Sequence, residues 1–199
     1  MSTIHALRQP EPHPKHTPAP PLDDAGQAVA DLLEALGRSP SGALAGTPQR
    51  VASTFRELLR REDVVPTFFA SDGYTDLVLI RDIPFHSLCE HHLLPFRGVA
   101  HVGYLPGYRI VGISTLPRVV EYFSRDLQLQ ERLTTDVANW LDAQLEPRGV
   151  GVVIEAEQLC MSLRGVGTIG TTTVTSAFLG ELADGGPHRQ AFHQSRRTP

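Results

Sequence analysis

The sequence has few cysteines and no long hydrophobic run, and each shortage excludes a class of protein. Only two cysteines, Cys89 and Cys160, occur among 199 residues. The stretch from Met1 to His5 leads into polar, proline-rich sequence without the apolar segment of a secretory signal, so we do not expect a secreted protein held by disulfides. No apolar run reaches membrane-spanning length, so we expect a chain of the reducing cytoplasm with no membrane partner.

An excess of charge of one sign is also missing. The formal net charge is -4, which argues against broad nucleic-acid binding, although local basic pockets can still form. The hydrophobic fraction of 41% and the charged fraction of 20% are those of an ordinary soluble protein. A chain of this length is long enough for one domain with a proper core and too short for two.

The two ends of the chain differ from its middle. Residues 1–22 contain six prolines, which remove hydrogen-bond donors and prevent helix formation, so we expect a flexible arm. Residues 184–199 are polar without apolar periodicity, and we expect a disordered tail there. Between them we expect a single domain over residues 23–183.

Hydrophobic periodicity predicts helices first and strands later. Asp23 or Asp24 can cap a first helix that Gly37 ends, and Thr47 with Pro48 can start a second. These amino-terminal helices belong to residues 23–70, and a core follows over residues 76–180. In the core we predict strands at 77–80, 97–105, 109–114, 150–157 and 171–178, and longer helices at 116–124 and 129–145.

The order of these elements predicts an α+β fold. We expect the strands at 97–105 and 109–114 to form an antiparallel hairpin, because Pro106 and Gly107 separate them. We expect an antiparallel sheet of four strands, with the two long helices on one face. Its open edges and its uncovered face indicate an oligomer that closes a larger barrel.

A thiol and two imidazoles lie close together in the run Ser-Leu-Cys-Glu-His-His at residues 87–92. Cys89 and His92 are three residues apart, so one turn can aim both at one ion, and sulfur with imidazole nitrogen suits zinc. Cys160 completes a set of three ligands if the fold brings it back, and three protein ligands leave the open position of a catalytic site. The alternatives are a chance surface cluster, a disulfide, or a structural site with His91 as the fourth ligand.

Five spaced motifs together resemble the GTP cyclohydrolase I family. They are Thr47-Pro48-Gln49-Arg50-Val51-Ala52, Cys89-Glu90-His91-His92 with Pro95-Phe96, Val111-Gly112-Ile113-Ser114, Gln130-Glu131-Arg132-Leu133, and Cys160-Met161 with Arg164-Gly165-Val166. The resemblance runs from about Ala25 to Leu179. It implies a tunnelling fold (T-fold), a toroidal homodecamer, and active sites where neighbouring chains meet.

The resemblance also implies a reaction of GTP that leads into pterin and tetrahydrofolate biosynthesis. The guanine imidazole ring is hydrolysed, formate is lost, and the ribose is rearranged to give 7,8-dihydroneopterin triphosphate. One zinc ion per subunit, held by Cys89, His92 and Cys160, would lower the pKa of its water from about 16 towards about 7. His91 resembles the family's proton-transfer histidine; the alternative is that it only orients a metal ligand.

Further residues receive substrate-side roles from the same resemblance. Glu131 is similar to the family's guanine anchor, because one carboxylate can accept from a ring N–H and from an exocyclic amine. The remaining polar and phosphate-side positions are Gln130, Ile113, Ser114, Arg118, Arg164 and Arg50, with Arg50 supplied by a neighbouring subunit. For Arg50 an ordinary solvated arginine is an equally good interpretation of the sequence alone.

Three positions depart from the family pattern. Gln158 stands where the family has a histidine, and Thr115 and Ser53 stand where it has lysines. Glutamine cannot relay a proton near neutral pH, and each lost charged phosphate contact costs about 1.5 to 3 kcal/mol. Two alternatives follow: a relative that stops at the ring-opened formamidopyrimidine or prefers fewer phosphates, and a catalytically silent module that binds a guanine nucleotide or a pterin.

Overall fold

The computed structural model describes residues 22–196. Residues 1–21 of the expected flexible arm and residues 197–199 of the expected tail lie outside this range. Contacts group the chain into two units, one that ends at Phe55 and one that begins at Arg56. The boundary falls inside the single domain that the sequence predicts.

The first unit contains the two predicted amino-terminal helices. Its elements are α1 (Asp24–Ala35), a short 3-10 turn (Gly42–Leu44) and most of α2 (Thr47–Leu58). Asp23 caps α1, because its side chain accepts a hydrogen bond of 2.9 Å from the backbone N–H of Gly26. Gly37 follows the helix with a φ of 71°, a left-handed conformation that glycine adopts without strain. Both predicted helix signals at this end of the chain are confirmed.

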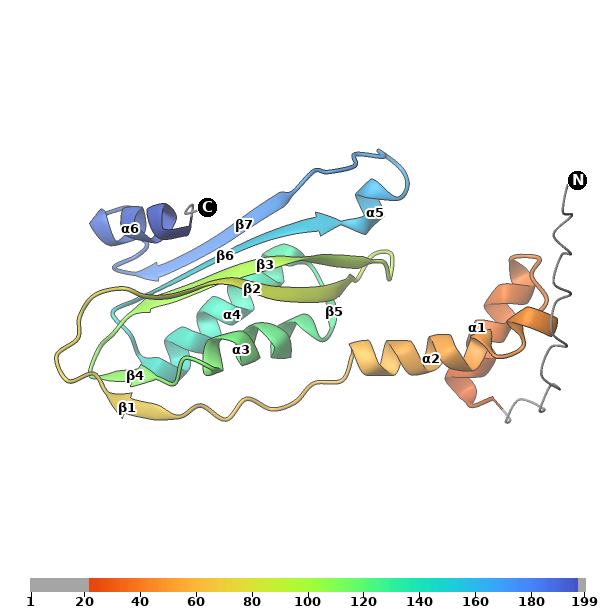
Figure 1. Ribbon diagram of the computed structural model, residues 1–199, viewed down its shortest axis with the longest axis horizontal. Helices are drawn as coiled ribbons and strands as arrows, with labels where there is room; N and C mark the ends of the chain where they lie inside the picture. The colour runs from red at the N-terminus through yellow and green to blue at the C-terminus, as the bar shows by residue number, and fades with distance from the viewer. Residues whose placement is uncertain (1–21, 197–199) are drawn as a thin grey trace, which may run out of the picture. The chain divides into compact units, whose positions relative to one another are not determined.

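The second unit alternates strands with helices (Figure 1). Its elements are β1 (Phe68–Ala70), β2 (Val78–Cys89), β3 (Pro95–Leu105), β4 (Arg109–Val111), α3 (Thr115–Ser124), β5 (Leu127–Gln128), α4 (Gln130–Leu145), β6 (Gly149–Gln158), α5 (Leu159–Ser162), β7 (Thr173–Gly180) and α6 (Pro187–Arg196). The helices predicted at 116–124 and 129–145 are α3 and α4, and the strands predicted at 150–157 and 171–178 are β6 and β7. The α+β class is confirmed.

The main sheet has five strands in the order β5-β2-β3-β6-β7, instead of the four that the sequence predicts. Strands β2, β3, β6 and β7 are antiparallel to their neighbours, whereas the two-residue β5 pairs with β2 in parallel. The predicted strand at 77–80 is much longer in the structure, since β2 continues to Cys89 through an irregularity between Ile80 and Ile83. This extension carries the chain directly into the predicted metal-binding run.

The predicted hairpin between residues 97–105 and 109–114 is wrong. Strand β4 pairs with β1, with Phe68 opposite Val111, and the two form a separate small sheet. The physical reason is that β3 has no free edge: β2 pairs with it up to Tyr104, and β6 pairs with it up to Leu105. The chain therefore has to leave the main sheet after the turn at Pro106 and Gly107.

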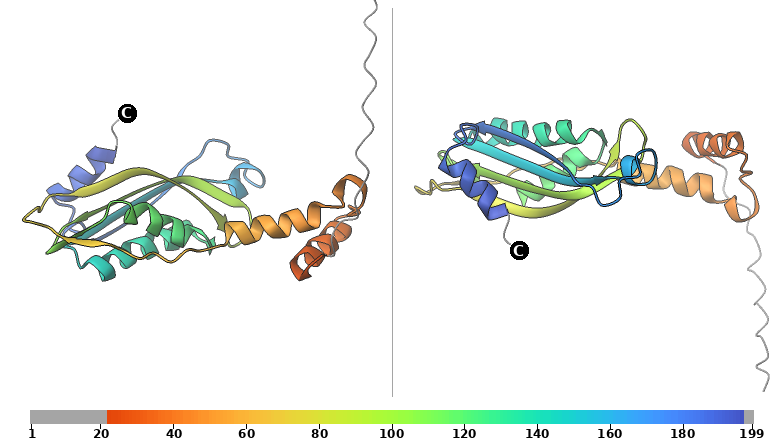
Figure 2. Two further views of the ribbon diagram at one scale, coloured as in Figure 1. Left: turned by 60° about the horizontal axis from the view of Figure 1, so that its bottom comes forward. Right: turned by 90° about the horizontal axis from the view of Figure 1, so that it is seen from above.

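Helices α3 and α4 cover one face of the main sheet, as the sequence predicts (Figure 2). The core between them is built from alternate strand residues and from helix residues three or four apart, which is the spacing that each element requires. Its fully buried members include Ala100, Val102, Tyr104, Val150, Val152, Ile154, Val119, Val120, Leu133, Val137 and Leu141. This layer fixes the strand ends that carry the candidate site.

The opposite face carries α6, where the sequence predicts a disordered tail (Figure 2). Phe192 of α6 is fully buried and meets the ring of Phe178 edge-on at 5.4 Å between centroids. A Cβ at Gly151 would lie only 2.9 Å from the Phe192 ring, so the glycine makes room for it. One aromatic anchor on an otherwise polar helix produces no hydrophobic periodicity, which is why the helix escapes a prediction from pattern.

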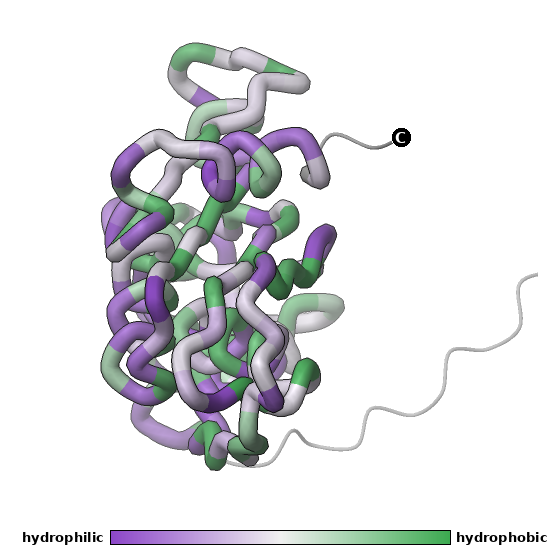
Figure 3. The backbone as a smooth tube through the Cα atoms, turned by 90° about the vertical axis from the view of Figure 1, so that its left-hand side faces the viewer, coloured by the Kyte–Doolittle hydropathy of each residue, from purple (hydrophilic) through white to green (hydrophobic). Residues whose placement is uncertain are grey.

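Hydrophobic and hydrophilic residues alternate over short distances along the chain (Figure 3). Within residues 22–196, none of the helices combines the length and the hydropathy that a membrane crossing requires. The apolar residues instead supply the helix-covered face of the main sheet.

Candidate active site

The carboxyl ends of strands β2 and β6 lie at the same end of the main sheet. Strand β2 ends at Cys89, and β6 ends at Gln158, two residues before Cys160. Both strands are antiparallel to β3, so they run in the same direction and terminate at the same end of the sheet. The pairs Leu88 with Pro95 and Phe96 with Gln158 place these ends on either side of the start of β3.

The predicted metal ligands come together there. One potential ligand atom from each of Cys89, His92 and Cys160 lies within 4.8 Å of the other two, and Sγ of Cys89 is 3.7 Å from Nδ1 of His92. A tight turn after β2 makes this possible, since the backbone N–H groups of His92 and Leu93 both donate to the carbonyl of Cys89. Two sulfurs with one imidazole nitrogen fit a zinc-type ion with an open fourth position.

The pKa of the Cys160 thiol lies above its usual value. Burial raises the pKa of Cys160, and the neighbouring Cys89 raises it further. Both cysteines are free thiols, so they form no disulfide. Because metal ligands must be thiolates, uptake of an ion by this cluster would release protons.

A pocket of about 290 Å³ opens beside the cluster. Its lining consists of Cys89, His91, His92, Gln128, Leu129, Gln130, Glu131, Gln158, Cys160, Met161 and Thr173. The structure thus brings together the three predicted ligands and four of the predicted catalytic or substrate residues: His91, Gln130, Glu131 and Gln158. The volume is at the lower end of the range for small-molecule sites, about 300 to 1,000 Å³, so a base fits more readily than a whole nucleotide.

The side chain of Gln130 is held by hydrogen bonds to other residues of the protein. Its side-chain nitrogen donates to the carbonyls of Ile154 and Thr173 at 3.1 and 3.0 Å, and its side-chain oxygen accepts from Nε2 of Gln158 at 2.8 Å. The residue is only 3% exposed, so these bonds hold the start of α4 against β6 and β7. That role differs from the substrate contact predicted from the sequence.

The other predicted substrate residues are not among the residues that line this pocket. Arg118 of α3 lines a second pocket of about 510 Å³, where Arg60, Arg125 and four acidic residues surround it. Ser114 stands just before α3, and Ile113 beside it is 69% exposed. Arg164 follows α5, close enough to Cys160 that its positive charge lowers the pKa of that thiol and so offsets part of the rise. Arg50 belongs to the first unit. Among the described residues that line the metal-side pocket, none is arginine or lysine.

Two of the three departures from the family pattern are not among the residues that line the pocket. Thr115 is buried at the first position of α3, and Ser53 is exposed on α2. Gln158 is the departure that lies in the pocket wall.

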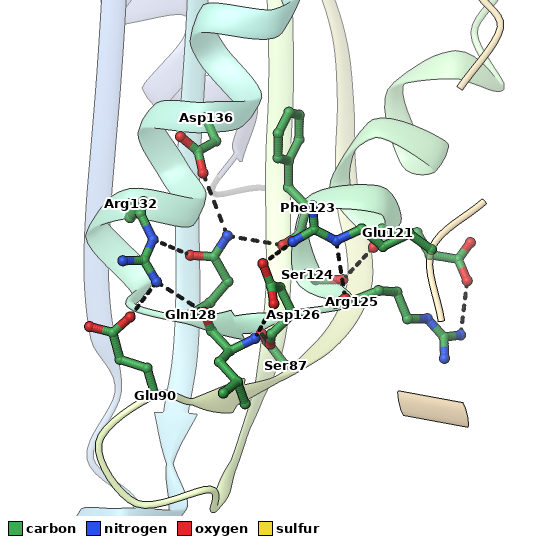
Figure 4. A network of polar contacts seen from close by, with 12 residues as sticks. Ser87, Glu90, Glu121, Phe123, Ser124, Arg125, Asp126, Gln128, Arg132 and Asp136 are labelled. Atoms are coloured by element: carbon green, nitrogen blue, oxygen red, sulfur yellow. Dashed lines mark hydrogen bonds and ion pairs between the residues drawn. The ribbon is translucent and has the colours of Figure 1, made fainter. Parts of the chain in front are cut away.

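A polar network beside the pocket was missed by sequence reasoning (Figure 4). Arg132 of α4 donates to Oε2 of Glu90 at 2.5 Å and to Oε1 of Gln128 at 2.9 Å. Gln128 in turn donates to the carbonyl of Phe123 at 3.1 Å. The only hint in the sequence is that Glu90 follows a predicted ligand and Arg132 follows the predicted guanine anchor.

Comparisons with known proteins agree with this site. The family model described as GTP cyclohydrolase I matches residues 25–197. GTP cyclohydrolase 1 of Allorhizobium ampelinum is 45% identical over 183 residues, which cover 88% of this chain and 91% of that protein. The enzyme of the same name from Streptococcus suis is 50% identical over 164 residues, covering 79% and 88%. That of Aquifex aeolicus is 50% identical over 156 residues, covering 77% and 85%.

Among solved structures, the apo form of the archaeosine synthase QueF-Like gives a TM-score of 0.43 with 20% identity, over 53% of this chain and 94% of that one. The sequence relatives share 45–50% of aligned residues over more than three quarters of the chain, and the family model spans both described units. The chain belongs to the GTP cyclohydrolase I family.

Proposed function

We propose that the protein hydrolyses the guanine imidazole ring of GTP, releases formate and rearranges the ribose to give 7,8-dihydroneopterin triphosphate. The observation that carries the proposal is the meeting of Cys89, His92 and Cys160 beside Glu131 in one pocket. The relatives named GTP cyclohydrolase 1 support the same activity, and no feature of the pocket favours ring opening alone or silent binding.

The donor set of the cluster fits one zinc ion per subunit. Cys89, His92 and Cys160 would hold it and leave one position free. Bound there, zinc would supply a Lewis acid that activates water for attack on the purine near neutral pH. The free thiols require a reducing compartment to stay available, which supports the expected cytoplasmic location.

Glu131 anchors the base. It is the second residue of α4 and lines the pocket. An ionised carboxylate only accepts hydrogen bonds, and guanine presents a ring N–H and an exocyclic amine side by side, whereas adenine presents an acceptor at the same ring position. Glu131 therefore selects guanine, while the buried bonds of Gln130 keep the start of α4 in place.

His91 and Gln158 have different roles near the reacting atoms of the substrate. His91 lines the pocket next to the ligands, and its imidazole can hand a proton to the ring nitrogen that leaves. Gln158 donates one N–H to Gln130 and cannot transfer a proton itself. Its remaining amide groups can hold substrate, so the second acid or base of the reaction is water or another side chain.

The complete site requires more than one chain. The metal-side pocket has no arginine or lysine among its described lining residues, yet a triphosphate needs cations. Arg118 lies in a different pocket of the same chain, and β5 and β7 are the outer strands of the described main sheet. These facts support a T-fold ring, in family terms a homodecamer, whose neighbouring subunits bring Arg50, Ser114 and Arg118 to each site, while Arg164 comes from the chain that carries Cys160.

The proposal is tested by incubating zinc-loaded protein with GTP and identifying the products by mass spectrometry. We expect formate and, after oxidation, a fluorescent pterin. Cys160→Ser serves as the matched control, because it removes one ligand and should abolish both zinc retention and turnover. A product that keeps its formyl group, or GTP binding without any change in purine absorbance, would overturn the proposal in favour of a ring-opening relative or a silent module.

A further inference from the structure

We infer that Arg132 and Glu90 form a positioning pair, which holds the turn that carries His91 and the metal ligands against helix α4. The inference rests on the proposed function, since it concerns the same site. It assigns the two residues no contact with the substrate. They act through His91 and through the residues on either side of Glu90, which are Cys89 and His91.

The guanidinium of Arg132 is fixed by three acceptors. It donates to Oε2 of Glu90 at 2.5 Å, to Oε1 of Gln128 at 2.9 Å and to the carbonyl of Leu127 at 2.9 Å (Figure 4). Gln128 is itself 3% exposed, and its amide nitrogen donates to the carbonyl of Phe123. A planar guanidinium held at several points has one orientation, so Arg132 offers Glu90 a rigid partner.

Glu90 is tied to this partner by its backbone as well as by its side chain. Its N–H donates to the carbonyl of Gln128 at 3.2 Å, while its carboxylate meets Arg132. The other carboxylate oxygen, Oε1, lies 3.8 Å from Nε2 of His91, within ion-pair distance. One carboxylate thus links a clamped arginine to the imidazole that faces the pocket.

The contact with Glu90 restricts the position of the His91 ring. Its side chain is 64% exposed, so packing does little to fix the ring. It touches His92 only edge-on, at 6.2 Å between ring centroids. Without the carboxylate of Glu90 the imidazole would sample several rotamers, and the productive one would be occupied for a smaller part of the time.

Helix α4 does not depend on the positioning pair. Gln130 fastens its first turn through bonds to Ile154 and Thr173, and Leu133 is fully buried. Glu131, which lies between Gln130 and Arg132, therefore keeps its place when Arg132 is changed. Loss of the pair should loosen the metal-binding turn and leave guanine binding nearly as it was.

The chain contains a matched control pair. Arg148 donates two hydrogen bonds to the carboxylate of Glu181, at 2.9 and 2.6 Å. Arg148 precedes β6 and Glu181 follows β7, so this pair lies at the end of the sheet away from Cys160. It has the same chemistry and comparable exposure, but neither Arg148 nor Glu181 lines the pocket.

The experiment compares Arg132→Met, Glu90→Gln and their double variant with wild type and with Arg148→Met. For each zinc-saturated protein we would measure kcat and KM for GTP, the zinc dissociation constant by competition with a chelator, and the melting temperature. Changes next to metal ligands typically cost about 10- to 100-fold in activity or metal affinity. We expect a loss of that size in kcat and a weaker zinc affinity in all three site variants, with KM changed by less than about threefold.

Coupling between the two residues decides whether they act as a pair. Once either partner is lost the link is broken, so the double variant should lose no more kcat than the worse single variant. Arg148→Met should keep wild-type kcat and zinc affinity even if its melting temperature falls. Wild-type kcat in Arg132→Met, a loss confined to KM, or losses that multiply in the double variant would each overturn the inference.

Failure of the proposed function would look different. If wild-type protein releases no formate from GTP, the proposed function falls. The zinc affinities of the same variants still test the positioning pair, because they require no turnover.

Discussion

At the scale of single residues, Gln158 shows how neighbours decide what a side chain can offer. The side-chain nitrogen of Gln130 faces two backbone carbonyls, so its oxygen must be the atom that faces Gln158. Gln158 therefore has to use its own N–H there, and its oxygen is left as an acceptor. The hydrogen-bond inventory fixes both amide orientations without any assumption about the substrate.

Gln158→Met tests the buried half of this arrangement. The variant leaves the side-chain oxygen of Gln130, a residue 3% exposed, without its partner, and an unsatisfied buried acceptor costs about 1 to 3 kcal/mol. We expect the free energy of unfolding, measured with urea, to fall by that amount. Gln144→Met, at an exposed position of α4, should change it by less than about 0.5 kcal/mol. Equal stabilities of the two variants would contradict the buried amide pair.

The candidate site was predictable from sequence where ligand chemistry restricts the choice. Cys160 could be assigned to Cys89 and His92 because the chain has only one other cysteine, and the structure confirms the convergence. The link between Glu90 and Arg132 could not be predicted. It joins residues 42 positions apart, and a charged pair of surface type carries no mark in a sequence until the fold brings its members together.

At the scale of elements, Tyr104 joins the main sheet to the small one. It is a buried residue of β3, and its phenol oxygen accepts a hydrogen bond of 3.2 Å from the backbone N–H of Val111 in β4. Strand β4 cannot pair with β3 directly, since β3 has a partner on each side. Strand β4 pairs with β1 instead, and the Tyr104 side chain adds one hydrogen bond between the small sheet and the main one.

Tyr104 also makes stability depend on alkaline pH. Burial raises the pKa of Tyr104, although the hydrogen bond from Val111 offsets part of the rise. The folded state therefore favours the neutral phenol, and its stabilisation is complete below the usual tyrosine pKa of about 10. It is lost as the pH rises from there through the folded-state pKa, at no more than about 1.4 kcal/mol per pH unit.

We expect Tyr104→Phe to lower stability near pH 7 by about 1 to 3 kcal/mol, because the N–H of Val111 loses its acceptor. Above about pH 10, however, the unfolding free energy of the variant should fall less steeply than that of wild type. Urea unfolding at a series of pH values measures both effects. Tyr108→Phe is the control, because Tyr108 is 99% exposed and should alter neither. Parallel alkaline slopes for wild type and Tyr104→Phe would refute the linkage.

Elements with strong periodicity were predictable, and elements defined by long-range contacts were not. α4 carries Leu133, Val137 and Leu141 at helical spacing, so its position follows from sequence. The partner of β4 depends on which edges of β3 are free, and α6 depends on one ring, Phe192, fitting over Gly151. Neither condition can be read from local pattern, because both are set by segments distant in the chain.

At the scale of the whole molecule, three arginines and the metal cluster line different pockets of the chain. The metal cluster and Glu131 share one pocket, whereas Arg118 lines another together with Arg60 and Arg125. In that second pocket the arginines lie among carboxylates, and Arg125 pairs with Glu121 at 2.9 Å. In the proposed ring, Arg118 of a neighbouring subunit would reach the substrate. Arg118 and Glu131 of one site would then come from different chains.

Subunit complementation tests this division. Arg118→Ala and Glu131→Gln should each reduce formate release from GTP severely, because in the proposed site one removes a phosphate cation and the other removes the guanine anchor. If each site draws Arg118 and Glu131 from different chains, a randomly assembled equal mixture should recover about one quarter of wild-type activity. An equal mixture of Glu131→Gln with Cys160→Ser should recover none, because both residues line one pocket of one chain. Failure of the first mixture, with assembly verified by size-exclusion chromatography, would mean that each subunit holds its own Arg118 at its own site and that the shared-site arrangement is wrong.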